Sequence, residues 1–500
     1  MLKKIGKLFL FALVFTMALT GCGTGFVAPK DNPSADAPVY NNGTMAVQKG
    51  DYLYYVNGKG SNTADNTYNT PIKGSIMRSK LSDNDTGVSL APSSNDLLND
   101  DVSSDTVMIV PKIFYSSNSK AGLYIYGDRI YYVSPSVEKD KKGNVLTSST
   151  DVFSCKLDGT DIKSIAYVAS NSFDYYFWQA DDGTVYFAYV ADSKVTSVNC
   201  SNGRSVTLVE EYTNTPVLGS NGSVYFTQSV LKDEEDESQT EMFNAFYSIA
   251  MNAASSDAKV ELLDKNGRTL TTYYNVERDA SDPEYDEKYD KVKELKINPM
   301  AYYDGYVIFG RNDDGRTGTT YSYTYAYNVE TKDVRYITKL TLSSIVYVKE
   351  ALIASYAGTN TVIVKVPFGS SIFDSATADT QAEILLNSSV TVLKVTDDRI
   401  YYLNSSSRIA YVPLTGDYLE KEETVISATN ANTSGFAPVI TDSVVYYLSS
   451  EGTFTDYLCY TMYAGLEEDD LTKIRIGKLS EADNTTLKEM HEADKPTKED

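Results

Sequence analysis

A short pattern of turn and strand residues recurs along this 500-residue chain. Each copy begins with a turn built on Asp, Asn, Gly or Glu, continues with a β-branched or apolar residue and ends in a pair of aromatic or aliphatic residues. Asp-Gly and Asn-Gly reach positive φ at little cost, so they favour tight turns between antiparallel strands. The clearest copies are residues 127–132 and 397–402. The pattern predicts a series of β-hairpins.

The spacing of the copies points to a repeated structural unit. Eight copies are present, and the first residues of their terminal pairs are Tyr54, Tyr131, Tyr186, Tyr225, Ile308, Ile353, Tyr401 and Tyr446. Five of the seven intervals are close to the roughly 40–50 residues that one propeller blade requires. The two longer intervals contain polar insertions, at 93–106 and 232–241, and either leaves room for a further degenerate copy.

The residues that follow each turn are apolar on both faces of the expected strand. Such a strand must be covered on two sides, and stacked propeller blades provide this cover while closure removes exposed sheet edges. Most copies are followed by a segment that we interpret as the third strand of a four-stranded unit, as at 75–78, 152–160, 361–366 and 408–414. The competing fold, a string of β-sandwiches, requires about 100 residues per module and alternating polarity.

The predicted fold class is therefore all-β, with a single β-propeller over residues 44–479. Eight four-stranded blades are expected, and seven are the alternative. We expect residues 38–47 to help to close the ring beside the last blade. Residues 295–303 and 283–293 are the stretches with room for a helical turn or two.

The repeat units resemble a known kind of protein. A D-x-I-Y-Y strand followed by a K-L-D-G-T turn, as in 128–132 and 156–160, is similar to the propeller repeats of surface lipoproteins of Gram-positive bacteria. Those families have no agreed function and are distantly similar to the low-density-lipoprotein-receptor type of propeller. The resemblance covers roughly 44–479 and implies a propeller fold and a surface location.

The first 22 residues form a separate signal that ends in Leu-Thr-Gly-Cys. Lys3, Lys4 and Lys7 precede an apolar run, 8–19, that is short for a membrane span. This leader resembles the lipobox of bacterial lipoproteins. The resemblance implies a signal peptide over 1–21, lipid such as palmitate on Cys22, and an anchor on the outer face of the bacterial cell membrane.

The ends of the mature chain have low-complexity compositions. Residues 22–43 are rich in Gly, Pro, Asn, Asp and Ala, which predicts a flexible tether, and residues 480–500 predict a disordered charged tail. The formal net charge is −23, from 68 acidic and 45 basic side chains. Phosphate binding needs clustered Lys and Arg, so the charge argues against nucleic-acid partners.

The sequence contains few of the side chains that commonly act in catalysis. The single histidine, His491, lies in the predicted tail. The predicted propeller therefore has no imidazole to act as the base of a catalytic triad or as a ligand of an ordinary zinc or copper site. Carboxylates such as Asp304 and Asp397 are abundant enough for glycoside hydrolysis, but both sit in repeat turns, where solvated hairpins explain them. The oxygen-rich runs 83–85 and 312–315 are likewise better explained as turns than as calcium sites. We predict no catalytic, cofactor-binding or metal residues.

Cysteine and tyrosine usage completes the pattern. Beyond Cys22, the residues Cys155, Cys200 and Cys459 are predicted to be unpaired thiols, with a Cys155–Cys200 bridge as the alternative. Most of the 41 tyrosines are expected to pack between blades. Those at strand ends near a channel mouth, beside Asn or Asp, would suit carbohydrate or peptide recognition.

Three functions follow from these observations. The first is a lipid-anchored, non-enzymatic propeller that binds a protein, a peptide or a glycan and that contacts the membrane through Cys22. The second is a carboxylate-dependent, glycan-active enzyme in the same fold. The third is a structural member of an envelope complex. The sequence does not identify the ligand.

Overall fold

A computed structural model describes most of the chain between residues 28 and 475. The described ranges are 28–58, 74–81, 106–110, 122–136, 148–231, 242–270, 272–273, 293–294, 296–314, 320–358, 360–369, 382–426, 430–432, 436–442, 444–450, 458–462 and 473–475. The predicted signal peptide, Cys22, the run 83–85, His491 and the predicted tail lie outside these ranges. The chain divides into two compact units, Met1–Ser172 with Thr429–Asp500 (unit 1) and Phe173–Ala428 (unit 2).

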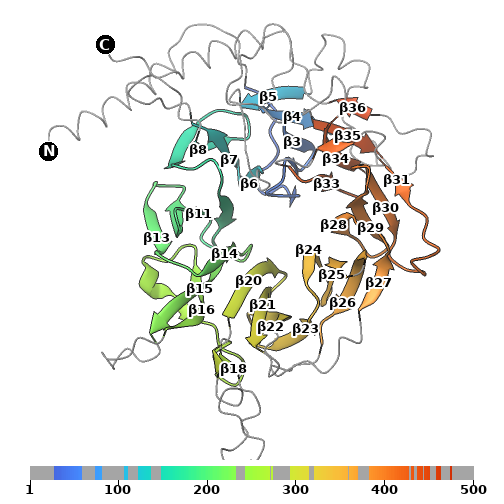
Figure 1. Ribbon diagram of the computed structural model, residues 1–500. Helices are drawn as coiled ribbons and strands as arrows, with labels where there is room; N and C mark the ends of the chain where they lie inside the picture. Colours follow the sequence, from blue (N-terminus) through green and yellow to red (C-terminus); the bar gives the residue numbers. More distant parts are fainter. Residues whose placement is uncertain are drawn as a thin grey trace, which may run out of the picture. The chain divides into compact units, whose positions relative to one another are not determined.

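The described residues of unit 1 form three antiparallel sheets (Figure 1). The first contains β1 (Val39–Tyr40), β2 (Ala46–Lys49), β3 (Tyr52–Val56), β4 (Ile76–Lys80) and β5 (Thr106–Val110). The second contains β6 (Tyr124–Tyr126), β7 (Arg129–Pro135), β8 (Thr150–Lys156) and β9 (Lys163–Val168). The third contains β32 (Ala431–Asn432), β33 (Val439–Ile440), β34 (Val444–Ser449), β35 (Leu458–Met462) and β36 (Lys473–Arg475).

The described residues of unit 2 form five four-stranded sheets and one two-stranded sheet. In chain order the first two four-stranded sheets contain β10 (Asp174–Gln179), β11 (Val185–Ala191), β12 (Lys194–Asn199) and β13 (Ser205–Val209), then β14 (Asn214–Leu218), β15 (Ser223–Leu231), β16 (Met242–Ala250) and β17 (Val260–Glu261). A 3-10 turn, η1 (Ser256–Ala258), precedes β17, and β18 (Thr272–Tyr273) pairs with β19 (Lys293–Glu294).

The remaining three sheets of unit 2 repeat the same order. They contain β20 (Lys296–Tyr303), β21 (Tyr306–Asp314), β22 (Thr320–Asn328) and β23 (Val334–Thr338), then β24 (Leu342–Val348), β25 (Ala351–Ala357), β26 (Thr361–Pro367) and β27 (Glu383–Leu386), and finally β28 (Thr391–Val395), β29 (Arg399–Leu403), β30 (Ile409–Pro413) and β31 (Thr424–Val425). No helix in the described ranges is long and apolar enough to cross a membrane.

The fold is an all-β propeller with four-stranded blades, as predicted. The six four-stranded sheets and the two five-stranded sheets take up all eight copies of the sequence pattern, one copy in each sheet. The segments expected to be third strands are β4, β8, β26 and β30, and each pairs with the strand of its copy. The turn-and-pair pattern therefore marks one strand in each of these sheets.

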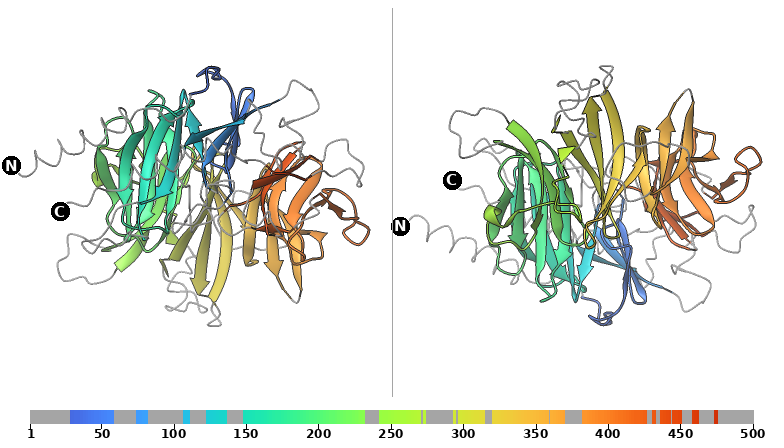
Figure 2. Two further views of the ribbon diagram at one scale, coloured as in Figure 1. Left: turned by 90° about the horizontal axis from the view of Figure 1, so that it is seen from above. Right: turned by 90° about the horizontal axis from the view of Figure 1, so that it is seen from below.

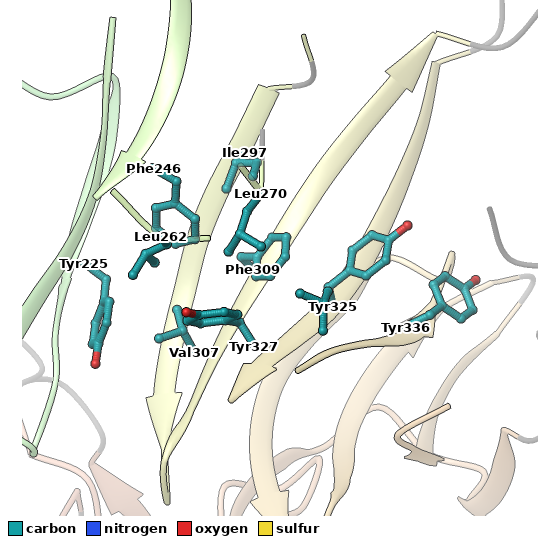
Figure 3. Packing of buried hydrophobic residues seen from close by; sticks show 11 residues of the cluster. Tyr225, Phe246, Leu262, Leu270, Ile297, Val307, Phe309, Tyr325, Tyr327 and Tyr336 are labelled. Carbon is teal, nitrogen blue, oxygen red and sulfur yellow. The ribbon is translucent and has the colours of Figure 1, made fainter. Parts of the chain in front are cut away.

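The repeat strands are covered on both faces, as their composition requires. All five residues of β3 and all six of β34 are buried. Figure 3 shows the cover between two neighbouring sheets of unit 2, where Tyr225 and Phe246 face Val307, Phe309 and their neighbours. Phe246 and Phe309 meet edge to face with ring centroids 5.7 Å apart. Aromatic side chains from facing sheets thus form one continuous core.

The sheets of unit 2 stack in chain order. Their first strands lie next to one another, with contacts between β10 and β14, between β14 and β20, and between β24 and β28. In Figure 2 the green, yellow and orange sheets of this unit stand as adjacent layers. Neighbouring sheets therefore meet face to face along the chain.

Two local expectations were wrong. Residues 296–303 form β20, because this segment pairs with β21 over its whole length and supplies the first strand of its sheet. Residues 38–47, expected beside the last blade, pair within the first sheet instead, through β1 and β2. The segment also reaches the second sheet, through a bridge between Thr44 and Leu123.

Two buried cations hold the segment that precedes the first sheet. The ammonium of Lys49, which is 1% exposed, donates hydrogen bonds to the carbonyl oxygens of Ala35 (2.9 Å) and Ala37 (3.0 Å). Nη1 of Arg78 donates to the carbonyl of Asp31 (2.7 Å) and to Oδ1 of Asn32 (2.8 Å). Burial lowers the pKa of Lys49. The later part of the segment expected to be a tether is therefore bound to the sheet.

Replacement of Lys49 tests this attachment. We expect Lys49→Ala to speed amide hydrogen exchange across residues 31–38, because two charge-assisted hydrogen bonds are lost, and to lower the free energy of unfolding by about 1–3 kcal/mol. Lys194→Ala is the control, because Lys194 is half-exposed and pairs with Glu210 at the surface. Unchanged exchange in residues 31–38 of Lys49→Ala would contradict the assignment.

Candidate functional site

A recess of about 140 Å³ opens between the β10–β13 sheet and the β14–β17 sheet, within unit 2. Its lining combines polar side chains with apolar ones. The side chains that matter for recognition are Tyr186, Asn199, Asn202, Arg204, Met251 and Asn252. The recess combines one aromatic ring, three amides and one guanidinium.

The first wall follows from strand register. Trp178 on β10 pairs with Tyr186 on β11, and Tyr186 pairs in turn with Asn199 at the end of β12. Directly opposed residues of neighbouring strands point to the same face of a sheet. The three side chains therefore form one row, and the rings of Trp178 and Tyr186 lie 6.2 Å apart.

The turn between β12 and β13 supplies the polar groups of this wall. Oδ1 of Asn199 accepts the backbone N–H of Ser201 (2.9 Å), and Oδ1 of Asn202 accepts that of Arg204 (2.9 Å). Gly203 has a φ of 71°, which closes the turn. Because both amide oxygens are used inside the turn, the two side-chain NH₂ groups are left as donors.

The second wall is the chain that leaves β16. The backbone N–H of Met251 donates to the carbonyl of Gly222 (2.7 Å), and the hydroxyl of Ser197 donates to the carbonyl of Met251 (2.6 Å). These bonds hold the chain at Met251 across the end of the β10–β13 sheet. Trp178 also approaches Gly222 closely, because a Cβ at Gly222 would lie 2.1 Å from Cε2 of the indole.

Two positions of the repeat that lie at the recess can be compared with their counterparts in other sheets. Among the eight first residues of the terminal pairs, seven are buried and Tyr186 is half-buried. In the β24–β27 sheet, Phe368 occupies the place that corresponds to Met251, since its N–H donates to the carbonyl of Glu350 (2.8 Å). The ring of Phe368 packs on Tyr306 (5.1 Å) and Tyr347 (6.1 Å). Leu81, Leu157, Val329 and Leu414 make the equivalent backbone hydrogen bond in other sheets, so Phe368 is an aromatic exception at this position and Met251 is not unusually small.

The turn carboxylates considered for catalysis have ordinary structural roles. Asp397 forms an exposed ion pair with Lys349 (2.6 Å) from the turn of the preceding sheet. Asp304 adopts a φ of 41° in the turn between β20 and β21. Asn312 and Asp313 belong to β21. No group of three or more His, Cys, Asp or Glu residues in the described ranges is placed to hold a metal ion.

The cysteines in the described ranges are free where their side chains are described. Cys155 and Cys200 are both unpaired, which confirms the predicted thiols and rules against the bridge between them. Burial raises the pKa of the Cys155 thiol to about 12 and also raises that of Cys200. A thiol of that kind is a poor nucleophile near neutral pH.

Sequence reasoning predicted one feature of this site and missed the rest. Tyrosine beside asparagine at a strand end was expected, and Tyr186 with Asn199 has this arrangement, but between two neighbouring sheets. Arg204 and Asn252 were not singled out, because they come from turns of two different sheets. The weak copy of the repeat at 182–187 gives no sign that its tyrosine is left accessible.

Comparison with known proteins indicates only distant similarity. No protein-family model and no curated protein match the chain. Similar solved structures include a puromycin-hydrolysing peptidase of Mycobacterium tuberculosis (11% identity, TM-score 0.40, 73% of this chain and 55% of that one). Others are dipeptidyl peptidase 4 of Porphyromonas gingivalis (10%, 0.41, 94% and 62%) and an oligogalacturonate lyase in complex with manganese (10%, 0.34, 62% and 82%). The chain thus spans 55% and 62% of the lengths of the two peptidases.

The contact between Trp178 and Gly222 can be tested with a matched pair of variants. We expect Gly222→Ala to lower the free energy of unfolding by about 2–5 kcal/mol, because backbone strain adds to a clash with the indole. Gly183→Ala is the control, since its φ of 82° is similar and a Cβ there meets nothing within 4 Å. It should cost only about 1–2 kcal/mol. Equal losses in thermal or denaturant unfolding would show that the indole does not constrain Gly222.

Proposed function

We propose that the protein is a lipid-anchored binding protein of the bacterial cell surface and that it binds a glycan in the recess beside Tyr186. The recess is the observation that carries the proposal. It offers a flat ring next to converging amide and guanidinium donors, which is a combination suited to hydroxyl-rich ligands. The lipid on Cys22 and the surface location remain proposals from the leader sequence.

The polar side chains of the lining favour a sugar over an apolar peptide side chain. Asn199 is half-buried, so its amide would lose hydration without a partner if an apolar group filled the recess. A sugar ring presents hydroxyls at its edge for the amides of the recess, while its C–H face packs on Tyr186. The half-buried state of that ring leaves one face accessible to a ligand.

Binding to envelope oligosaccharides tests the glycan proposal. We expect Tyr186→Ala to weaken binding roughly 10-fold or more, because the stacking surface is removed, as measured by calorimetric titration of the full chain. Tyr189→Ala is the matched control. Tyr189 lies on the same strand on the opposite face, where its ring stacks on Phe187.

The possible results separate the candidate functions. Equal affinity in the Tyr186→Ala and Tyr189→Ala variants would exclude the recess as the glycan site. Release of free sugar from the oligosaccharides during the titration, abolished by a single carboxylate-to-amide change, would favour the enzymatic function instead.

Replacement of the predicted lipid-bearing residue tests the anchor. We expect Cys22→Ser to move the protein from the membrane fraction to the soluble fraction of bacterial cells, because no thiol remains to carry lipid. Cys200→Ser is the control, since that thiol is free and only partly exposed. Incorporation of labelled palmitate into the parent chain and into Cys200→Ser, but not into Cys22→Ser, is the accompanying readout. Membrane retention of Cys22→Ser would contradict the anchor.

A further inference from the structure

The recess carries one charged side chain and no carboxylate. Arg204 lines it, and its other lining side chains are neutral. Within the described ranges, the guanidinium of Arg204 has no hydrogen-bond or ion-pair partner. Among the described residues, Arg204 is exposed and unpaired, as Arg408 is, whereas Arg129 is paired with Asp161 (2.7 Å) and Arg335 with Glu350 (2.8 Å). Arg204 is thus an uncompensated cation beside a cavity.

The groups around Arg204 are hydrogen-bond donors. Asn199 and Asn202 use their amide oxygens within the β12–β13 turn, so their NH₂ groups remain. A guanidinium with two amide donors beside it matches the lone pairs of an oxyanion, since planar guanidinium groups bind carboxylate and phosphate through parallel N–H bonds. This wall of the recess therefore has the chemistry of an anion-binding surface.

The overall charge of the chain makes this local arrangement informative. A formal net charge of −23 repels anions at long range, so an anionic ligand requires a local cation that no protein carboxylate neutralises. A neutral ligand would need no such group. The position of Arg204 in the recess supplies the required local charge.

We propose that the recess selects a glycan that carries an oxyanion, either a carboxylate or a phosphate substituent, and that Arg204 binds this group. This inference rests on the proposed glycan-binding function and names its ligand class. Tyr186 packs on the sugar ring, and the NH₂ groups of Asn199 and Asn202 donate to the same anionic group. Arg204 is therefore the residue that determines specificity.

Titration of three probes tests the inference. The probes are an oligosaccharide of glucuronic acid, a phosphate-substituted glucose polymer and a glucose oligosaccharide of the same length as the first. We expect at least one anionic probe to bind more tightly than the glucose oligosaccharide. The Arg204→Gln variant should weaken that binding roughly 10- to 100-fold and leave the affinity for the glucose oligosaccharide unchanged. Arg204→Lys should retain part of the preference, because it keeps the charge without the planar fork.

Arg408→Gln is the matched control, because Arg408 is exposed and this variant changes the net charge by the same amount as Arg204→Gln. It should leave all affinities unchanged. Binding of the uronate alone or of the phosphate polymer alone would identify the source of the oxyanion. Equal binding of neutral and anionic probes, with loss in Tyr186→Ala, would overturn this inference and leave the proposed function standing. Failure of all three probes to bind would overturn both.

Discussion

The structure depends on strands that are apolar on both faces. A residue pair such as Tyr446 and Tyr447 directs one ring to each side of its sheet, and both rings are buried. A sheet built on such strands cannot leave one face in water, so each sheet must lie between covering layers. The stacking of sheets in chain order, and the aromatic cores between them, follow from this requirement.

At the candidate site the packing between neighbouring sheets is less complete than elsewhere. Between the β20–β23 and β24–β27 sheets, Phe368 and the tyrosines around it fill the end of the gap. Between the β10–β13 and β14–β17 sheets, Met251 stands in the corresponding place, and the nearby ring of Tyr186 is left half-buried. The recess therefore lies where the tyrosine of one repeat is only half-buried, and the adjacent turns supply its polar groups.

Much of the framework could be predicted, because it is encoded locally. Turn residues followed by an apolar pair mark one strand in every sheet, and the third strands follow at short range. The errors concern segments whose role depends on distant partners. Residues 296–303 lack a strong strand pattern and become β20 by pairing with β21, and the segment before the first sheet is bound by Lys49 and Arg78 through backbone carbonyls. Carbonyl acceptors have no sequence signature.

The amino-acid sequence by itself determined the all-β class and the position of each repeat strand. Those properties depend on residue type and on spacing within a few dozen residues. Only the tertiary structure decided which gap between sheets stays open and which side chains meet there. Tyr186, Arg204 and Asn252 come from separate strands and turns. Their proximity depends on how two sheets pack, a relation that no single segment of the chain encodes.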